Sequence, residues 1–109
     1  MTDKTVILCT CATEEEAHKL ARVLVEERLA ACVNVIPHVR SFYRWKGEVQ
    51  SDSEWLLLIK SSRGLFAALA ARLESVHSYE VPEAIALAVL EGSANYMDWF
   101  QANLREGAE

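Results

Sequence analysis

The stretch from residue 30 to residue 62, AACVNVIPHVRSFYRWKGEVQSDSEWLLLIKSS, limits most strongly what this chain can fold into. It predicts two long strands joined by a turn at Lys46 and Gly47. A first strand over residues 30–45 would measure roughly 50 Å at about 3.3 Å a residue. Strands usually have about 5–6 residues, so this hairpin is longer than a domain of 109 residues can cover.

The outer part of the hairpin carries aromatic side chains on both faces. Pro37 cannot donate a hydrogen bond to a neighbouring strand, so it marks a bend or an edge segment in the first strand. Beyond this bend, Phe42 is out of phase with Tyr43 and Trp45. An exposed apolar surface of this kind marks an interaction site, so the hairpin tip predicts a partner surface.

The remaining segments predict the order β-α-β-β-α-β followed by a C-terminal helix. KTVILCT predicts the first strand, and Thr13 with Glu16 forms a capping box that opens a helix over about residues 13–28. SSRGLFAALAARLESV predicts a second helix, EAIALAVLEG a buried last strand, and an apolar stripe over residues 96–104 a short final helix. This order is the ferredoxin-like split βαβ pattern of the α+β class, with helices on one face of an antiparallel sheet. We expect a single domain over residues 1–109.

This topology brings two distant stretches together. We expect the first and last strands to be antiparallel neighbours in the middle of the sheet, so that Cys9 and Cys11 lie beside the segment 77–83. Side chains two apart on a strand point to the same side, and thiolates and imidazoles are ligands that select copper or zinc. Cys9 and His77 are therefore candidate metal ligands. Cys9 also suits a core position, and His77 suits a helix C-terminal cap.

The other cysteines and histidines carry weaker signals. Cys11 is more typical of a core position, and Cys32 lies within an apolar strand, which predicts a core residue. His18 on a helix face and His38 on the first hairpin strand have no implied partners. A C-x-C with one histidine does not match the four-ligand spacing of a structural zinc site.

Several charged residues lie where the predicted elements end. Asp52 and Glu54 share one face of their strand, and Glu80 and Glu83 lie in the turn YEVPE before the last strand. These four acidic residues are also typical of solvated positions in loops and at the edges of a sheet. Lys60 ends the apolar run LLLIK, where its ammonium either reaches solvent or pairs with an acid of a neighbouring element.

Composition excludes several classes of function. A net charge of −5 with scattered basic residues argues against nucleic-acid binding. The first apolar run is too short for a signal peptide, and no segment approaches the roughly 18 apolar residues of a membrane span. We therefore expect a cytoplasmic protein with reduced cysteines and no membrane contact. No nucleophile elbow, glycine-rich phosphate loop or Ser-His-Asp order is present, so the sequence predicts no enzyme.

In these motifs and their spacing, the chain resembles the CutA family of divalent-cation tolerance proteins. The likeness covers nearly the whole chain, and its most specific parts are AACVNVIP, the S-x-Y-x-W-x-G register over residues 41–47 and YEVPE. The resemblance implies a ferredoxin-like fold assembled as a tight homotrimer. In such a trimer the long hairpin would pack between subunits and bury Tyr43, Trp45 and Trp55.

The resemblance also implies a site for copper or another divalent cation. By position its ligands fall on Cys9 and His77. Two positions depart from the family pattern, because Ser78 replaces a proline and Val76 stands where a second histidine would be. Two ligands per subunit favour weak or intersubunit copper binding over a tight, dedicated site.

A second set of residues, Lys60, Tyr79, Glu80 and Glu83, matches typical family positions and in a trimer would line a cleft between subunits. Two hypotheses follow: a tolerance protein that binds copper, and a trimeric small-molecule-sensing or interaction module that uses this cleft. A cavity at Lys60, Tyr79 and Glu83, rather than at Cys9, favours the second. An enzyme with Lys60 and Glu83 as charge partners would need a strongly shifted pKa there.

Overall fold

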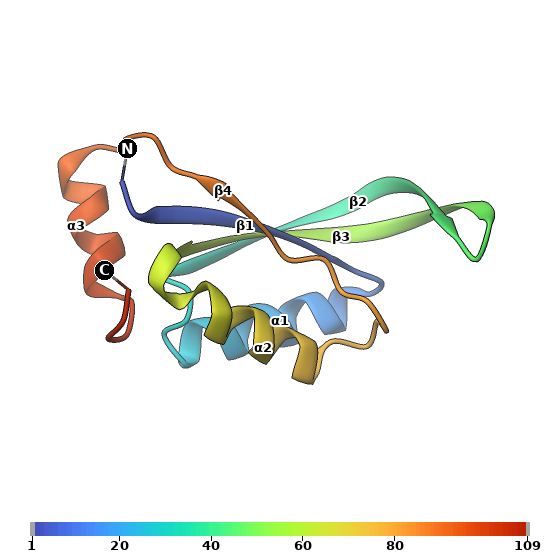
Figure 1. The fold of residues 1–109 in the computed structure, drawn as a ribbon, viewed down its shortest axis with the longest axis horizontal. Coiled ribbons are helices and arrows are strands. Elements are labelled where there is room, and N and C mark those ends of the chain that lie inside the picture. Colours follow the sequence, from blue (N-terminus) through green and yellow to red (C-terminus); the bar gives the residue numbers. More distant parts are fainter. Residues whose placement is uncertain (1, 109) are drawn as a thin grey trace.

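The computed structural model of the protein describes residues 2–108. Its elements are β1 (Lys4–Cys11), α1 (Glu14–Glu26), β2 (Cys32–Trp45), β3 (Glu48–Ser62), the 3-10 turn η1 (Arg63–Leu65), α2 (Phe66–Val76), β4 (Ile85–Ala88) and α3 (Ala94–Ala102). The strands form one antiparallel sheet in the order β2-β3-β1-β4. α1 and α2 cover one face of the sheet, and α3 lies beyond its end near the N-terminus (Figure 1). The predicted fold class and element order are confirmed.

The last strand lies at the edge of the sheet, so its predicted place in the middle is wrong. β4 is antiparallel to β1 as expected, from Thr5 opposite Ala88 to Leu8 opposite Ile85. The other side of β1 is occupied by β3 along its whole length, and β3 also carries β2 through the hairpin. Only an outer edge remains for β4, and its residues are exposed rather than buried.

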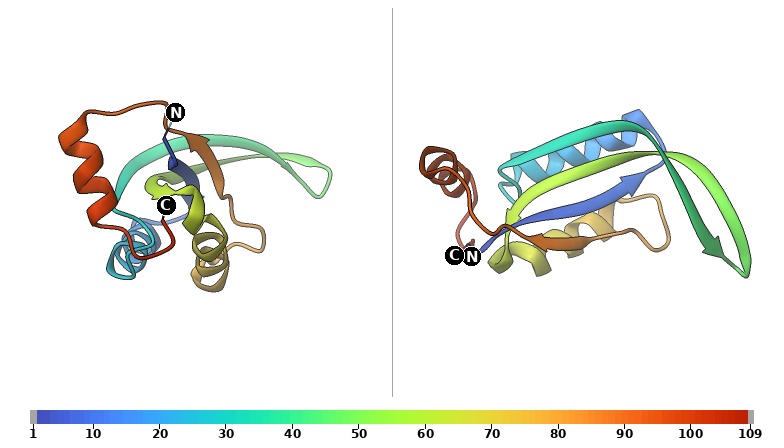
Figure 2. Two further views of the ribbon diagram at one scale, coloured as in Figure 1. Left: turned by 60° about the vertical axis from the view of Figure 1, so that its left-hand side comes forward. Right: turned by 90° about the horizontal axis from the view of Figure 1, so that it is seen from above.

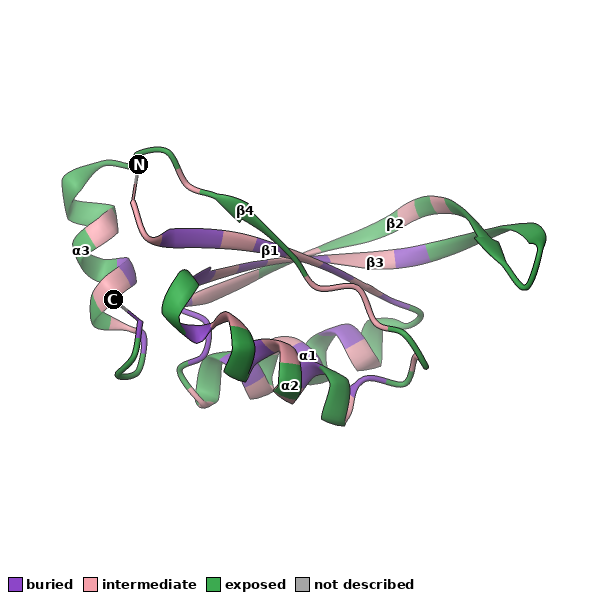
Figure 3. Cartoon of the chain, viewed as in Figure 1, coloured by how far each residue is buried: buried purple, intermediate pink, exposed green. Residues whose placement is uncertain are grey.

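The core lies between the sheet and the helices α1 and α2 (Figure 3). Alternate residues of β1 and β3 point into it, because successive side chains of a strand face opposite sides. The largest fully buried apolar side chains there are Ile7, Leu20, Leu24, Leu29, Leu57, Ile59, Leu69 and Leu73, together with the thiols of Cys9 and Cys11. Burial of each large apolar side chain contributes about 1.5–3 kcal/mol, which fixes the face that the helices cover.

α1 begins where the sequence predicts and ends two residues early, at residue 26. The Thr13 hydroxyl accepts the backbone N–H of Glu16 at 3.1 Å. Arg28, just after the helix, has a φ of 57°, the left-handed conformation common behind helix C-termini. The Glu27 carboxylate, just after α1, accepts bidentate hydrogen bonds of 2.8–3.0 Å from the Arg72 guanidinium of α2. These bonds link the two helices. No helix in the described chain combines the length and apolar character needed to cross a bilayer.

β2 and β3 form the long hairpin that the sequence predicts, with its turn at Lys46 and Gly47. Both residues have positive φ, 51° and 84°, as a two-residue type I′ turn requires. The outer part of the hairpin forms an arm that extends beyond the helices (Figure 2), in a molecule measuring 44 × 25 × 22 Å. Phe42 and Val49 on this arm are 72% and 65% exposed, so the arm leaves apolar surface uncovered within one chain.

A β-bulge lies in the middle of the hairpin, where the arm begins. The strand pairing shifts there from Ile36 opposite Leu56 to Val39 opposite Glu54. Residues 37–38 of β2 thus oppose a single residue of β3, which is the bend that the proline in this strand predicts. Because side chains alternate along a strand, one extra residue moves the odd-numbered side chains of β2 to the opposite face of the sheet.

Candidate functional site

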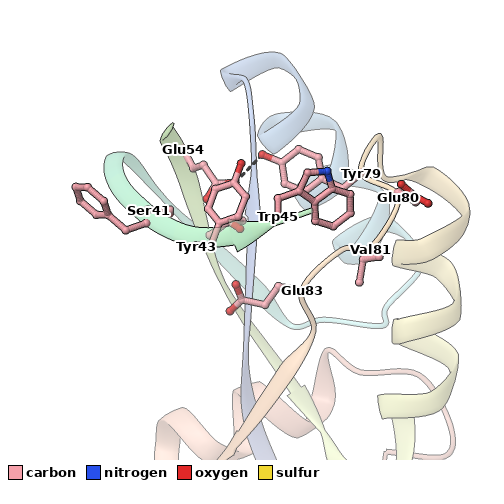
Figure 4. A pocket seen from close by; sticks show the side chains of 10 residues that line it. Ser41, Tyr43, Trp45, Glu54, Tyr79, Glu80, Val81 and Glu83 are labelled. Carbon is pink, nitrogen blue, oxygen red and sulfur yellow. Dashed lines mark hydrogen bonds between the residues drawn. The ribbon is translucent and has the colours of Figure 1, made fainter. Parts of the chain in front are cut away.

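A cavity of about 540 Å³ lies where the arm leaves the body of the protein. The end of β1, the arm and the loop between α2 and β4 all contribute to it (Figure 4). Its lining residues are Thr10, Ser41, Phe42, Tyr43, Trp45, Glu54, Tyr79, Glu80, Val81 and Glu83. Three segments that are distant in sequence therefore meet at one hollow, beside the face of the sheet that the helices leave open.

The bulge places the aromatic wall of this cavity. Before the bulge, odd-numbered residues of β2 such as Val33 and Val35 pack on the core. After it, the odd-numbered Tyr43 and Trp45 lie on the open side, on the same face as Glu54 of β3. The side chains of Tyr43 and Trp45 gather with that of Tyr79 (Figure 4). The sequence predicted a bend here. Which side chains of β2 lie on the face of Glu54 depends on the pairing with β3, which the sequence alone does not show.

Glu54 is the most deeply placed carboxylate of the cavity, with 6% of the residue exposed. The Tyr79 hydroxyl donates a hydrogen bond of 2.5 Å to its Oε2 atom. Burial raises the pKa of Tyr79 above its usual value, and the hydrogen bond and charge of Glu54 raise it further. On the arm, the Tyr43 hydroxyl donates in the same way to Asp52. Each tyrosine thus holds one acidic side chain beside the hollow.

Glu83 adds a second carboxylate to the lining. Its pKa is raised above the usual value, first by burial and then by the nearby negative charge of Glu54. None of the lining residues in the described chain is a Lys, Arg or His. Two carboxylates that repel one another, with no cationic side chain between them, favour a bound cation. The aromatic faces attract positive charge as well.

The structure places Cys9 and Cys11 on the same side of β1, as expected, but that side faces the core. Both residues are fully buried. Burial is the main cause that raises the pKa of the Cys9 thiol to about 12 and that of Cys11 to about 11. The Cys9 Sγ atom lies 3.8 Å from the carbonyl oxygen of Thr10. Both thiols therefore remain protonated at neutral pH, whereas a metal ligand must be a thiolate.

His77 lies next to the end of β1, as the topology predicts, but both of its ring nitrogens are engaged. Nε2 donates to the carbonyl oxygen of Thr10 at 2.8 Å, and Nδ1 accepts the backbone N–H of Tyr79 at 3.0 Å. Copper would need a thiolate and a free imidazole nitrogen, and Cys9 and His77 present neither in this arrangement. Within residues 2–108, no group of three or more His, Cys, Asp or Glu side chains could hold a metal ion.

The remaining predicted residues lie apart from the cavity. Lys60 lies six residues along β3 from Glu54, about 20 Å at the usual rise per residue. It donates to the Tyr96 hydroxyl at 3.3 Å, and its Nζ atom is 5.5 Å from that ring. Of the set predicted for a cleft, Tyr79, Glu80 and Glu83 therefore meet in one chain and Lys60 does not.

Cys32 is only half-buried, so its predicted core position is wrong within one chain. It lies before the bulge on an even-numbered position, which faces away from α1 and α2. His18 and His38 flank the Trp55 ring, with ring centroids at 6.4 Å and 5.5 Å. This ring cluster was not predicted from the sequence, because it joins a helix to both hairpin strands.

The fold and the cavity together define a small ferredoxin-like domain with an acidic, aromatic-walled hollow at the end of its sheet. Residues 5–103 match the sequence model of the family described as CutA1 divalent ion tolerance protein. The chain belongs to this family.

Relatives and solved structures agree with this assignment. The divalent-cation tolerance protein CutA of Thermus thermophilus is 49% identical over 98 residues, which is 90% of this chain and 95% of that protein. Protein CutA, chloroplastic, of Arabidopsis thaliana is 44% identical over 100 residues, 92% of this chain but only 55% of the relative. The chain thus spans about half the length of the plant protein. The crystal structure of CutA1 from Oryza sativa matches with a TM-score of 0.92 at 40% identity, covering 94% of each chain.

Proposed function

We propose that this protein contributes to divalent-cation tolerance by binding a divalent cation in the acidic cavity, with Glu54 and Glu83 as its carboxylate ligands. The observation that carries the proposal is that the deeply placed Glu54 carboxylate and Glu83 line one cavity, that the charge of Glu54 acts on Glu83, and that no Lys, Arg or His is among the described residues of the lining. Hard divalent cations prefer oxygen ligands and keep several waters when the protein supplies only one or two carboxylates. The family name supports a role with divalent ions.

Copper bound by Cys9 and His77 is the competing assignment. The two residues flank the same Thr10 carbonyl, which supports their inclusion in a test. Copper binding there requires the Cys9 thiol to lose its proton and His77 to release one of its two backbone partners. Soft thiolate and imidazole ligands select copper, whereas carboxylates select ions such as Mn²⁺. The choice of metal therefore separates the two sites.

The test is a pair of titrations, with Mn²⁺ followed by electron paramagnetic resonance and with Cu²⁺ followed by calorimetry. For the cavity, Glu54→Gln and Glu83→Gln are compared with the wild type, and Glu74→Gln, exposed on α2, is the matched control. We expect each cavity variant to weaken Mn²⁺ binding at least about tenfold, the effect of about 1.4 kcal/mol, and the control to bind as the wild type does. Equal Mn²⁺ binding in all four proteins would refute the assignment.

For the copper site, His77→Ala and Cys9→Ser are titrated with Cu²⁺ beside the wild type. If copper binds the wild type tightly and both variants lose it, the metal site belongs at Cys9 and His77. If copper binding survives in both variants, these residues are not its ligands.

The cavity assignment also fixes the direction of a pH effect. Because the pKa of Glu83 is raised in the folded protein, its carboxyl keeps a proton to a higher pH than an ordinary glutamate does. A cation competes with this proton. Mn²⁺ affinity should therefore rise with pH through the raised pKa of Glu83, and the Glu83→Gln variant should lose this part of the pH dependence.

Assembly belongs to the same proposal. A homotrimer would cover the exposed side chains of the arm, such as Phe42 and Val49, and the free edges of β2 and β4. Lys60 reaches the acidic cavity only if another copy of the chain supplies it. A cleft completed in this way supports the second candidate, a small-molecule-sensing module. Sedimentation equilibrium tests the trimer, and a Lys60→Met variant that changes the cavity's ligand affinity only in the assembled form would favour the module.

Two further parts of the proposal concern activity and location. The family is named for tolerance rather than catalysis, and within one chain Glu83 has Glu54 rather than Lys60 as its charged neighbour, which supports a binding protein rather than an enzyme. We expect the protein in the cytoplasm. The Arabidopsis relative is named as chloroplastic, so cell fractionation is the test of location.

A further inference from the structure

The loop that follows α2 is held at two consecutive residues by side chains from elsewhere in the fold. His77 is the first point. Its side chain is fully buried, and it joins the carbonyl of Thr10 in β1 to the backbone N–H of Tyr79. The imidazole ring also packs on the Tyr79 ring, with centroids 4.7 Å apart. These bonds require the neutral tautomer with its proton on Nε2, because Nδ1 must accept.

Glu16, in the first turn of α1, is the second point. Its carboxylate accepts the backbone N–H of Ser78 at 2.7 Å and the Ser78 hydroxyl at 2.9 Å. In a complete capping box this carboxylate would turn back to the N-cap residue of its own helix. Here it reaches a residue 62 positions away instead. The Glu16 side chain is only 14% exposed, whereas Ser78 lies at the surface. Hydrogen bonds to an ionised carboxylate are stronger than those between neutral groups.

The held loop leads directly into the cavity. Tyr79 follows the two anchored residues, and its hydroxyl donates to Glu54, one of the two carboxylates of the proposed cation site. We infer that His77 and Glu16 are positioning residues for Tyr79, and through it for the Glu54 carboxylate, and that His77 is not a metal ligand in this chain. This inference rests on the proposed function for its effect on cation binding.

The state of the His77 ring tests the inference independently of affinity. Nitrogen NMR of ¹⁵N-labelled protein distinguishes a protonated ring nitrogen from an accepting or metal-bound one. We expect His77 to show the Nε2–H tautomer and to keep it when Cd²⁺, a diamagnetic divalent probe, or Zn²⁺ is added. A change of either ring nitrogen to the metal-bound state would overturn the inference.

The Glu16 contact is tested by a double-mutant cycle. His77 has φ −79° and ψ 143°, the extended conformation that a following proline requires. Ser78→Pro should therefore fold while removing both bonds to Glu16. We expect Glu16→Gln to weaken Mn²⁺ binding about tenfold, the effect of losing one strong hydrogen bond, in the wild-type background. In the Ser78→Pro background the same change should have almost no effect.

Controls separate positioning from stability. Glu15→Gln, a neighbouring exposed change in the same turn, should leave Mn²⁺ binding unchanged. His77→Asn keeps an acceptor for the Tyr79 amide, through the turn that asparagine forms with the residue two positions on, so it should bind Mn²⁺ better than His77→Ala. If Glu16→Gln lowers the melting temperature but leaves the Mn²⁺ affinity of the folded protein intact, Glu16 has only a structural role and the inference fails.

The positioning role and the proposed cation site can be refuted independently of each other. If the wild type binds no Mn²⁺, the cation site is wrong, and the positioning role is then judged by hydrogen exchange of the Tyr79 amide. Faster exchange of this amide in both Glu16→Gln and His77→Ala, but not in Glu15→Gln, supports the positioning role. Unchanged exchange in both variants refutes it.

Discussion

The thiol of Cys9 offers the sharpest quantitative test, because its environment decides between the two metal assignments. With a pKa of about 12, about one Cys9 molecule in 10⁵ is a thiolate at pH 7. An ordinary cysteine, with a pKa of about 8.5, is about 3% thiolate at the same pH. Thiolate is the form that reacts, so we expect native Cys9 to alkylate about 3,000-fold more slowly than an unfolded cysteine.

The same pKa sets the cost of making Cys9 a copper ligand. About five pH units separate neutrality from the Cys9 pKa, and each unit corresponds to about 1.4 kcal/mol. Deprotonation therefore costs about 7 kcal/mol at pH 7 before any metal bond forms. Copper at Cys9 must recover this free energy in addition to displacing a backbone partner of His77.

The assay is alkylation by iodoacetamide at pH 7, quenched over time and read by peptide mass spectrometry. Cys32 is half-buried and serves as the internal reference in the native protein, while protein in urea gives the unfolded rate for each thiol. Cys11, with a pKa of about 11, should also be slow. If native Cys9 reacts within about tenfold of its rate in urea, the thiol is neither buried nor protonated as described. Cys9 would then be available as a copper ligand.

Two other outcomes follow from the same structure. In an alkaline titration followed by tyrosinate absorbance, Tyr79 should ionise well above the usual pKa of about 10, and this late step should be absent in Tyr79→Phe. Because the pKa of Tyr79 is raised in the folded protein, the protein should lose stability as pH rises above about 10. An unchanged titration curve in the variant would contradict the Glu54 contact. If the proposed homotrimer forms through the arm, Phe42→Ser, at a residue that is 72% exposed in one chain, should shift sedimentation toward the monomer. Arg40→Ser, also on the arm and exposed, should sediment as the wild type does. Unchanged sedimentation of Phe42→Ser would show that Phe42 lies outside any interface.

The parts of this structure that the sequence predicts are those governed by local signals. The capping residue Thr13, the helical spacing of the leucines and the Lys46–Gly47 turn each act over a few residues, and each is found where expected. The edge position of β4 was mispredicted because it depends on which side of β1 is already occupied, and an apolar run does not carry that information. The exposure of β4 in one chain has the same cause.

The candidate site divides in the same way. Tyr79, Glu80 and Glu83 were grouped with Lys60 by resemblance; these three lie close together in one turn of the chain, and they do share the cavity. Lys60 was grouped with them by resemblance, and within one chain the pairing along β3 places it elsewhere. Glu54 was noted only as an edge acid, because its partner Tyr79 is 25 positions away. Contacts between side chains that are distant in sequence, such as Glu54 and Tyr79, cannot be predicted from one sequence alone.

The number of residues at the bulge determines which side chains of the arm line the cavity, and therefore the charge of the ligand that the cavity suits. In a chain two residues shorter, with Pro37 and His38 deleted, Val39 would follow Ile36 directly and pair with Trp55, so that Arg40 would stand opposite Glu54. The arm would then turn Arg40, Phe42 and Arg44 toward Glu54, in place of the side chains that now form the wall. A cavity suited to cations would become one crossed by arginine–glutamate pairs, without a single substitution. Insertions and deletions at this point are therefore a route by which related chains would exchange one class of ligand for another.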